Sequence, residues 1–380
     1  MNLEQTCWTA SGGWRPHPPG GVTDAGLVLV FGGTATLEDG APLADVRAAY
    51  PDAFIFGCST AGEICDTTVT DDAVVVTGVH FDNTRIRYAG IRMIDVGDSY
   101  RAGERLARTL PPVGLVHVFV LSDGLQVNGS ELVKGLAAGL PADVSITGGL
   151  SGDGDRFQKT LVVLDGKAVA DAVGVIGLYG DQLRVGYASL GGWDSFGPER
   201  VITRSQGNVL YELDGKPALD LYKEYLGEHA SGLPSTGLLF PLSLRTQEGD
   251  TPVVRTILGI DEENQGMIFA GDMPQGAYAR LMKANFDRLI DGAVGAARTS
   301  QQAVRGASPE LAILISCVGR KMVLKQRIEE EVEGVRDVLG PATALTGFYS
   351  YGEISPFTPS ARCELHNQTM TITTFSERAA

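Results

Sequence analysis

A nine-residue stretch occurs in two closely similar copies, one near each end of the chain. The first copy is Phe56–Ile64 (FGCSTAGEI) and the second is Thr346–Ile354 (TGFYSYGEI). Each copy follows an apolar run typical of a buried strand and ends in Gly-Glu-Ile. A third loop, Thr147–Gly154 (TGGLSGDG), has the same small, polar character without the Glu-Ile ending. Three such loops after three strands indicate a ligand site built by duplication.

Three stretches of the chain show the strand–helix–strand pattern of a β-α-β unit. Each begins and ends in an apolar run and carries an amphipathic helix between the two runs. The units are Gly26–Phe56, Leu115–Ile146 and Leu311–Tyr349. The apolar run Ala73–His80 and the alternating run Arg85–Ile94 predict further strands, as does Leu183–Leu190. The predicted fold class is α/β or α+β, with mixed sheets.

Three further segments are predicted from local patterns. Residues 1–25, with their tryptophans and prolines, are predicted as an irregular lead-in. Helical periodicity predicts a helix at Ser99–Leu110, a long helix at Ala277–Val304 and a strongly charged helix at Lys321–Leu339.

The length of 380 residues is too great for one typical core and predicts two domains. We place them at residues 26–205 and 206–376, after the short strand Arg200–Ser205. Each contains one Gly-Glu-Ile loop, so we expect the two domains to be related and to be built from β-α-β units.

The net charge of −15 repels phosphate backbones and argues against nucleic-acid binding. The N-terminal segment lacks the pattern of a signal peptide, and no apolar run approaches the ~20 residues that a membrane span needs. The five cysteines show no zinc or redox spacing and are predicted to be reduced thiols. We therefore expect a soluble, cytoplasmic protein that does not insert into a membrane.

An enzymatic role is tested first at the stretch around Ser59. Gly57–Ala61 resembles the nucleophile elbow of hydrolases, which requires a helix directly after the serine. Residues 63–72 have low helix propensity, so this requirement is not met. Cys58 would need a histidine base, and no neighbouring residue identifies one. A hydrolase using Ser59 or Cys58 is therefore an alternative, and we expect a non-catalytic protein.

Acidic and histidine side chains define the other candidate sites. Asp123, Asp153 and Asp155 match no calcium-loop spacing, so turn formation explains them better than a metal site. His366 lies in a polar cluster after the second Gly-Glu-Ile and is the strongest candidate among the histidines for a binding or metal-ligating role. A purely structural hydrogen-bonding role explains it at least as well. If a haem is bound, the axial ligand is expected among His366, His229 and His117.

Eight segments together resemble the FIST family of two-domain sensory modules. They are Phe56–Ile64, Leu121–Glu131, Thr147–Gly154, Tyr211–Tyr222, Leu238–Leu242, Ser316–Arg320, Gly347–Pro356 and Leu365–Thr371. The resemblance runs from about Gly26 to Phe375. It implies sensing of a small ligand such as an amino acid and signalling through a histidine kinase. Some members resemble haem-containing nitric-oxide sensors. Since no transmembrane or kinase segment is seen here, signalling would need a separate partner.

The leading hypothesis is a non-catalytic sensor of a small ligand, without a required cofactor, that acts on a separate histidine kinase. The alternative is a haem-based gas sensor. The glutamates of the two Gly-Glu-Ile loops could hold an ammonium group, and glycine N–H groups a carboxylate. An equally weighted interpretation has both glutamates accepting hydrogen bonds from a neighbouring loop. The predicted ligand-binding residues are Ser59, Thr60, Glu63, Asp123, Asn128, Ser151, Asp153, Tyr349, Tyr351, Glu353, His366 and Asn367.

Overall fold

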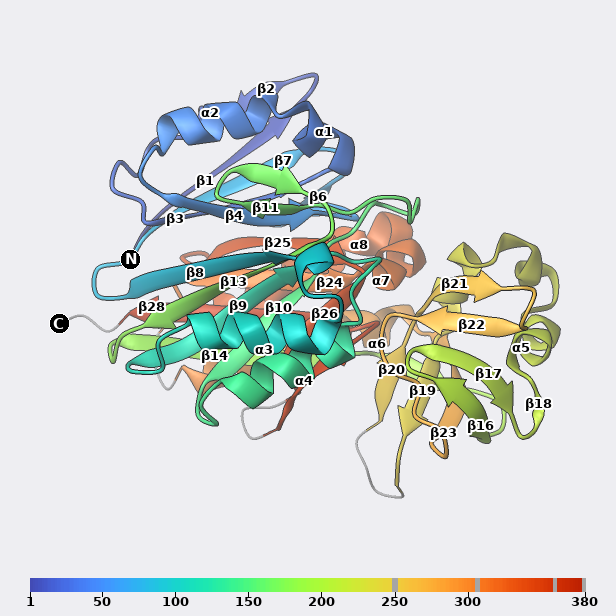
Figure 1. The fold of residues 1–380 in the computed structure, drawn as a ribbon. Helices are drawn as coiled ribbons and strands as arrows, with labels where there is room; N and C mark the ends of the chain where they lie inside the picture. The colour runs from blue at the N-terminus through green and yellow to red at the C-terminus, as the bar shows by residue number, and fades with distance from the viewer. Residues whose placement is uncertain (248–251, 305–307, 358–360, 378–380) are drawn as a thin grey trace.

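A computed structural model describes residues 1–247, 252–304, 308–357 and 361–377. The predicted class is confirmed: the protein is α+β, with mixed sheets and helices. Figure 1 shows two parts, which we call the body (residues 1–192 and 285–377) and the inserted domain (residues 193–284). Within the described ranges, no helix combines the length and the apolar character that crossing a membrane requires.

Within the described residues, the body contains three sheets that face one another. The first has the order β12 (Lys167–Val169), β11 (Val162–Leu164), β4 (Phe54–Ser59), β3 (Leu27–Gly32), β7 (Val74–His80), β1 (Asn2–Thr9) and β2 (Gly13–Arg15). The second has the order β27 (Cys363–His366), β26 (Gly352–Pro356), β10 (Ser145–Leu150), β9 (Leu115–Ser122), β13 (Ala172–Tyr179) and β8 (Arg85–Arg92). The third has the order β6 (Thr68–Thr70), β5 (Glu63–Cys65), β25 (Ala344–Ser350), β24 (Leu311–Cys317), β28 (Met370–Glu377) and β14 (Leu183–Leu190).

The three sheets repeat one arrangement. Each has a central parallel pair, β3–β4, β9–β10 or β24–β25, which confirms the three predicted β-α-β units. An antiparallel closing strand lies beside the first strand of each pair: β7, β13 or β28. A further strand then pairs with the closing strand: β1, β8 or β14. The body is therefore a threefold internal repeat, and we call its members the first, second and third units.

Each unit gives a hairpin to the sheet of another unit. The hairpin β5–β6 of the first unit pairs with β25 of the third. The hairpin β11–β12 of the second unit pairs with β4 of the first, and β26–β27 of the third pairs with β10 of the second. Consequently, each sheet is completed only by residues from a second unit.

Equivalent glycines allow the parallel strands to approach in each unit. A Cβ at Gly57 would lie 1.7 Å from the Val30 carbonyl oxygen. At Gly148 and Gly347 the corresponding distances, to the carbonyl oxygens of the facing residues in β9 and β24, are both 1.8 Å. The Thr-Gly or Phe-Gly step in each loop motif is thus explained by backbone packing, since no side chain fits there.

Apolar side chains from all three sheets form one central core. It includes Phe31, Phe56, Phe119, Ile315 and Phe348, all essentially buried. Helices cover the outer faces, as Figure 1 shows for α2 over the first sheet and for α3 and α4 over the second. The body helices are α1 (Thr34–Asp39), α2 (Ala41–Ala49), α3 (Ser99–Thr109), α4 (Gly129–Gly139), α6 (Phe286–Ala303), α7 (Val318–Leu324) and α8 (Ile328–Leu339).

The inserted domain interrupts the third unit between β14 and α6. Its nine strands are β15 (Trp193–Ser195), β16 (Arg200–Gln206), β17 (Val209–Leu213), β18 (Lys216–Pro217), β19 (Leu242–Arg245), β20 (Val253–Arg255), β21 (Ile257–Asp261), β22 (Gly266–Phe269) and β23 (Tyr278–Ala284), as far as the described residues show. The helix α5 (Ala218–Leu226) packs on this sheet through a core of its own that includes Ile202, Tyr222 and Phe269.

Three local predictions differ from the structure. The N-terminal segment is not irregular throughout, because β1 and β2 lie in it and β1 pairs with β7 along seven residues. The segment predicted as one helix at 277–304 is β23 followed by α6, and the Asn285 side chain caps α6 by accepting from Arg288 N. The charged helix at 321–339 is divided at Lys325, which has a φ of 50°.

The predicted domain boundary near residue 206 stays a prediction. The sheets of the body draw strands from both sides of it.

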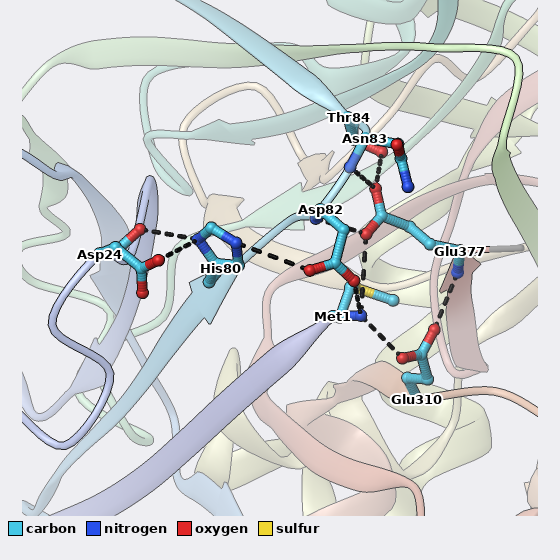
Figure 2. A network of polar contacts seen from close by, with 8 residues as sticks. All are labelled: Met1, Asp24, His80, Asp82, Asn83, Thr84, Glu310 and Glu377. Atoms are coloured by element: carbon cyan, nitrogen blue, oxygen red, sulfur yellow. Dashed lines mark hydrogen bonds and ion pairs between the residues drawn. The ribbon is translucent and has the colours of Figure 1, made fainter. Parts of the chain in front are cut away.

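A polar network joins the first and third units at the amino ends of the parallel strands (Figure 2). The Met1 amine is 2.9 Å from carboxylate oxygens of both Asp82 and Glu310. Glu377, at the end of β28, accepts from the backbone N–H groups of Asp82 and Asn83. This end of the body is therefore closed by ion pairs, and the loops singled out by the sequence lie at the opposite end.

Candidate functional site

The three glycine-rich loops interlock at the carboxyl ends of the parallel strands. Gly152 N donates to Ser59 O at 2.9 Å, which joins the second-unit loop to the first-unit loop. Ala61 N donates to Tyr349 O at 2.8 Å, and Tyr351 N donates to Leu150 O at 3.4 Å. The sequence motifs therefore meet in one place, and they hold one another through backbone hydrogen bonds.

The two predicted glutamates are fully buried and have equivalent contacts. Glu63 accepts from Thr60 Oγ1 at 2.5 Å and from Ala73 N at 3.1 Å. Glu353 accepts from Ser350 Oγ at 2.7 Å and from Thr369 N at 3.1 Å. Burial raises the pKa of each carboxyl from 4.5 to about 8. Each glutamate thus fastens its loop to the residue that precedes a closing strand, β7 or β28.

The second unit places a carboxylate at the same point from another strand. Asp123, which follows β9, accepts from Thr160 Oγ1 at 2.7 Å. Its Oδ2 also lies 3.4 Å from the backbone N of Asp171, the residue before the closing strand β13. Asp123 therefore does in the second unit what the glutamates do in the others, which explains why the middle motif lacks Glu-Ile.

The two side chains of the hydrolase alternative, Ser59 and Cys58, are buried in this junction. Ser59 Oγ donates to Gly152 O and accepts from Leu161 N, both at 2.8 Å. Cys58 is fully buried, and burial raises its thiol pKa well above the ordinary value. Ser59 holds the loops together and Cys58 packs in the apolar core, and neither shows the exposed, activated state that a nucleophile requires.

Other predicted residues are also fixed by internal hydrogen bonds. Ser151 Oγ donates to Ser122 O, and Asp153 accepts from Arg156. Tyr349 donates from its hydroxyl to the buried Glu331 at 2.7 Å. Asn367 accepts from Thr256 N of the inserted domain and donates to Tyr351 O.

The three candidate haem ligands lie in different environments. His117 is buried, and its ring nitrogens contact the hydroxyls of Ser145 and Thr147 at 2.7 and 2.9 Å. The Nε2 atom of His366 contacts Ser355 O at 2.7 Å, and burial lowers its pKa to about 4. His229 lies beside Phe240 in the inserted domain. Haem binding stays a prediction.

A cleft of about 650 Å³ lies between the second unit and the inserted domain. Its size is in the range of small-molecule sites. Of the predicted site residues, Asn128 is the one that lines it. The body and the inserted domain each supply one wall of the cleft. The residues that line it are Asp98, Ser99, Tyr100, Leu125, Gln126, Val127, Asn128, Glu131, Phe157 and Gln158 from the body, and Asn208, Leu258, Gly259, Ile268 and Phe269 from the inserted domain.

Two helices begin at the cleft. Asp98 caps α3 by accepting from Arg101 N at 2.8 Å, and Asn128 caps α4 by accepting from Ser130 N at 3.0 Å. The two caps are linked, because Asn128 N donates to Ser99 Oγ. The amino ends of α3 and α4 therefore bring partial positive charge to one side of the cleft. The carboxylates of Asp98 and Glu131 lie in the same lining.

The inserted domain is bonded to the cleft rim through Asp272. Its Oδ1 accepts from Asn128 Nδ2 at 2.8 Å, and its Oδ2 lies 2.6 Å from Lys134 Nζ. The hydrogen bond from Lys134 helps to lower the pKa of Asp272 against the opposing effect of burial. These contacts fix the two sides of the cleft relative to each other.

The wall residue Phe157 connects the cleft to the interlocked loops. Its backbone has a φ of 52°, a left-handed conformation that is rare for a bulky residue. Its ring stacks on Tyr351, and its N–H donates to the Tyr351 hydroxyl at 3.3 Å. Strained residues of this kind occur often at binding sites.

Sequence reasoning missed most of the cleft. The helix-cap pattern at Asn128 and Ser130 is the signal that comes closest to it. Phe157, Asn208 and Phe269 carry no local signal, because they come together only through the packing of two separate parts of the chain.

A curated relative and a solved structure were found by comparison with known proteins. The chain is 27% identical over 205 residues to the uncharacterized protein MJ1623 of Methanocaldococcus jannaschii. This match covers 50% of the chain and 38% of the relative, so the chain spans well under half the length of that protein. A crystal structure of cyanuric acid hydrolase from A. caulinodans aligns with 78% of this chain and all of its own, at 11% identity and a TM-score of 0.19.

Two family domains cover most of the sequence. The FIST N domain matches residues 26–216, and the FIST C domain matches residues 218–356. The first match alone spans half of the chain, and the second follows it directly. The protein therefore belongs to the FIST family.

Proposed function

We propose that the protein is a non-catalytic sensor that binds a small zwitterionic ligand, such as an amino acid, in the cleft. The observation that carries the proposal is the meeting of two helix amino ends with two carboxylates in one small-molecule-sized lining. Such a lining offers one partner to each pole of a zwitterion.

Each charged group of the ligand would meet a group of opposite charge in the cleft. A ligand carboxylate is stabilised at the amino ends of α3 and α4, where helix dipoles favour negative charge. A ligand ammonium would be stabilised by Asp98 and Glu131, and neither lysine nor arginine is among the lining residues that the structure describes. The ligand would compete there with Arg101, which pairs with Asp98, and with Lys134, which pairs with Glu131. Leu258, Ile268 and Phe269 provide an apolar wall for the remainder of the ligand.

Family membership supports a sensory role, since FIST domains are generally sensory or signalling modules. The burial of Ser59 and Cys58 supports binding without turnover. We propose that occupancy of the cleft changes how the inserted domain sits on the body, because the cleft lies between them and Asp272 bonds across it. A separate histidine kinase in the cytoplasm would read that change.

Thermal unfolding in the presence of each of the twenty amino acids tests ligand binding. A true ligand at 100 times its Kd stabilises the native state by about 2.7 kcal/mol. Titration calorimetry then gives the affinity of each amino acid that raises Tm. If none binds at millimolar concentration, the proposal is wrong.

Two matched variants locate the ligand. Gln158 lines the cleft and Gln206 is exposed elsewhere, in β16. We expect Gln158→Leu to weaken binding at least tenfold and Gln206→Leu to leave it unchanged. Equal affinity of both variants would place the ligand elsewhere. Autophosphorylation of a purified partner kinase, measured with the protein and with or without its ligand, tests the signalling step.

A further inference from the structure

Two cysteines from different sheets meet where the first unit contacts the third. Cys7 lies in β1 of the first sheet, and Cys65 ends β5, the strand that the first unit gives to the third sheet. The strands β1 and β5 contact each other at this point, and the interaction with Cys65 shifts the pKa of the Cys7 thiol downward. Both cysteines are free thiols and are partly exposed.

The backbone geometry independently brings these positions together. Gln5 Nε2 donates to Leu345 O at 2.8 Å, and Asp66 N donates to the same oxygen at 3.0 Å. Cys7 is two residues beyond Gln5 on β1, so the side chains of Gln5 and Cys7 point to the same face of the strand. Cys65 directly precedes Asp66. The Leu345 carbonyl group therefore accepts from both segments, the part of β1 that carries Cys7 and the end of β5 that carries Cys65.

The pair differs from the other cysteines in reactivity. Cys58 and Cys317 are fully buried, and the Sγ atom of Cys363 contacts Ile146 O at 3.4 Å. The interaction with Cys65 lowers the pKa of the Cys7 thiol, and the same interaction raises that of Cys65. A thiol with a lowered pKa and partial exposure is the one that reacts first with an oxidant.

We propose that Cys7 and Cys65 are a redox modification site that forms a reversible intramolecular disulfide with hydrogen peroxide as the oxidant. The Cys7 thiolate attacks the peroxide O–O bond, which gives a sulfenic acid and, after proton transfer, one water. The Cys65 sulfur then attacks the Cys7 sulfur, and the second oxygen leaves as water. Peroxide is reduced by two electrons as the two thiols are oxidised. This inference does not depend on the proposed ligand.

The bond would join two strands that are otherwise held together by packing and hydrogen bonds. β1 is near the outer edge of the first sheet, and β5 is paired with β25 of the third. A covalent link between them fastens the exchanged hairpin to the unit that gave it. It also restricts the unfolded chain, so the oxidised protein is expected to unfold at a higher temperature than the reduced protein.

Peroxide treatment of the full chain, purified under reducing conditions, tests the proposal. Of the five cysteines, three should remain titratable after denaturation, and dithiothreitol should restore all five. Peptide mass spectrometry without reduction should find Cys7 joined to Cys65. A different intramolecular pair, disulfides between chains, or only irreversible sulfonic acids would overturn the proposal.

Single variants separate the two chemical steps. In Cys65→Ser, peroxide should leave a sulfenic acid on Cys7 that dimedone traps, and in Cys7→Ser no intramolecular disulfide should form. Cys363→Ser is the matched control, and it should form the disulfide at the same rate as the parent chain. Loss of the disulfide in Cys363→Ser, or its persistence in Cys7→Ser, would contradict the assignment.

Discussion

The ring of Phe157 stacks on the ring of Tyr351, with centroids 4.4 Å apart and planes inclined by 16°. Phe157 belongs to the wall of the cleft, and Tyr351 belongs to the third-unit loop that interlocks with the other two. The stack is therefore a direct contact between the proposed ligand site and the loops at the centre of the threefold repeat.

The backbone of Phe157 makes a prediction about stability. At its φ of 52°, alanine retains the strain of the left-handed conformation and glycine does not. Phe157→Ala and Phe157→Gly both lose the stack, but the alanine variant should be less stable by about 1 kcal/mol. Urea unfolding of the two variants measures the difference. If the alanine variant is as stable as the glycine variant, Phe157 does not adopt the left-handed conformation.

The raised pKa values of Glu63 and Glu353 predict a loss of stability with rising pH. Each carboxyl keeps its proton to about pH 8 in the native state, whereas the unfolded chain releases it near pH 4.5. The stabilisation is complete below pH 4.5 and is lost as the pH rises through about 8, with a slope of up to about 1.4 kcal/mol per pH unit for each group.

Neutral variants test this linkage. Glu63→Gln and Glu353→Gln should each flatten the fall in free energy of unfolding between pH 5 and 8. Glu224→Gln, at an exposed position of α5, is the control and should keep the parent slope. An unchanged slope in both core variants would show that these carboxyls are ionised at neutral pH.

The equivalence of the three units predicts three equally severe substitutions. Gly57→Ala, Gly148→Ala and Gly347→Ala each place a Cβ within 1.8 Å of a carbonyl oxygen of the facing strand. We expect each variant to lose soluble expression or to unfold many degrees below the parent chain. Gly26→Ala is the control, because the nearest atom to its added Cβ is a side-chain carbon at 3.8 Å.

Asp272 should contribute more to the stability of the cleft rim than Lys134 does. Lys134 is more than half exposed, so Lys134→Met should cost at most about 0.5 kcal/mol. Asp272→Ala also leaves Asn128 Nδ2 without its partner and should cost about 1–2 kcal/mol. Hydrogen exchange of residues 126–134 should rise in the Asp272 variant and remain near the parent value in the Lys134 variant. The reverse order would contradict this account of the rim.

The buried ion pair of Arg320 and Glu331 predicts a large effect of neutralisation. Both side chains are fully buried and lie 2.7 Å apart. Glu331→Gln leaves the guanidinium charge uncompensated and should cost about 3–5 kcal/mol. Glu333→Gln, on the exposed face of the same helix, should change the free energy of unfolding by less than about 0.5 kcal/mol. Equal losses of stability in Glu331→Gln and Glu333→Gln would mean that the Arg320–Glu331 pair is accessible to water.

The duplicated loop motif marks the interlocked loops of the body because it reports backbone constraints. Gly57 and Gly347 are required by close strand packing, and Glu63 and Glu353 by the need for a buried acceptor. These constraints are local and recur in the sequence. The structure describes the glutamates as buried hydrogen-bond acceptors, while their role in ligand binding stays a prediction, as it does for the other residues predicted with them.

Other features could not be predicted because they depend on distant parts of the chain. The equivalence of Asp123 with the two glutamates is one such feature, because Asp123 comes from a different strand and no repeated Gly-Glu-Ile marks it. The helix predicted at 277–304 includes β23, whose strand conformation is set by pairing with β19 and β16. The cleft combines Asp98 and Phe157 of the body with Asn208 of the inserted domain, and nothing in the local sequence of any one indicates the others.

The exchange of hairpins has a consequence for biosynthesis. As the chain leaves the ribosome, the first sheet lacks β11–β12 until the second unit has been made, and the second sheet lacks β26–β27 until the third unit has been made. Meanwhile β5–β6 has no partner until β25 emerges. A nascent chain therefore exposes unpaired strand edges through most of its synthesis, which makes it aggregation-prone. Its final folding is a ring closure, in which the last unit to be translated completes the sheets of the earlier ones.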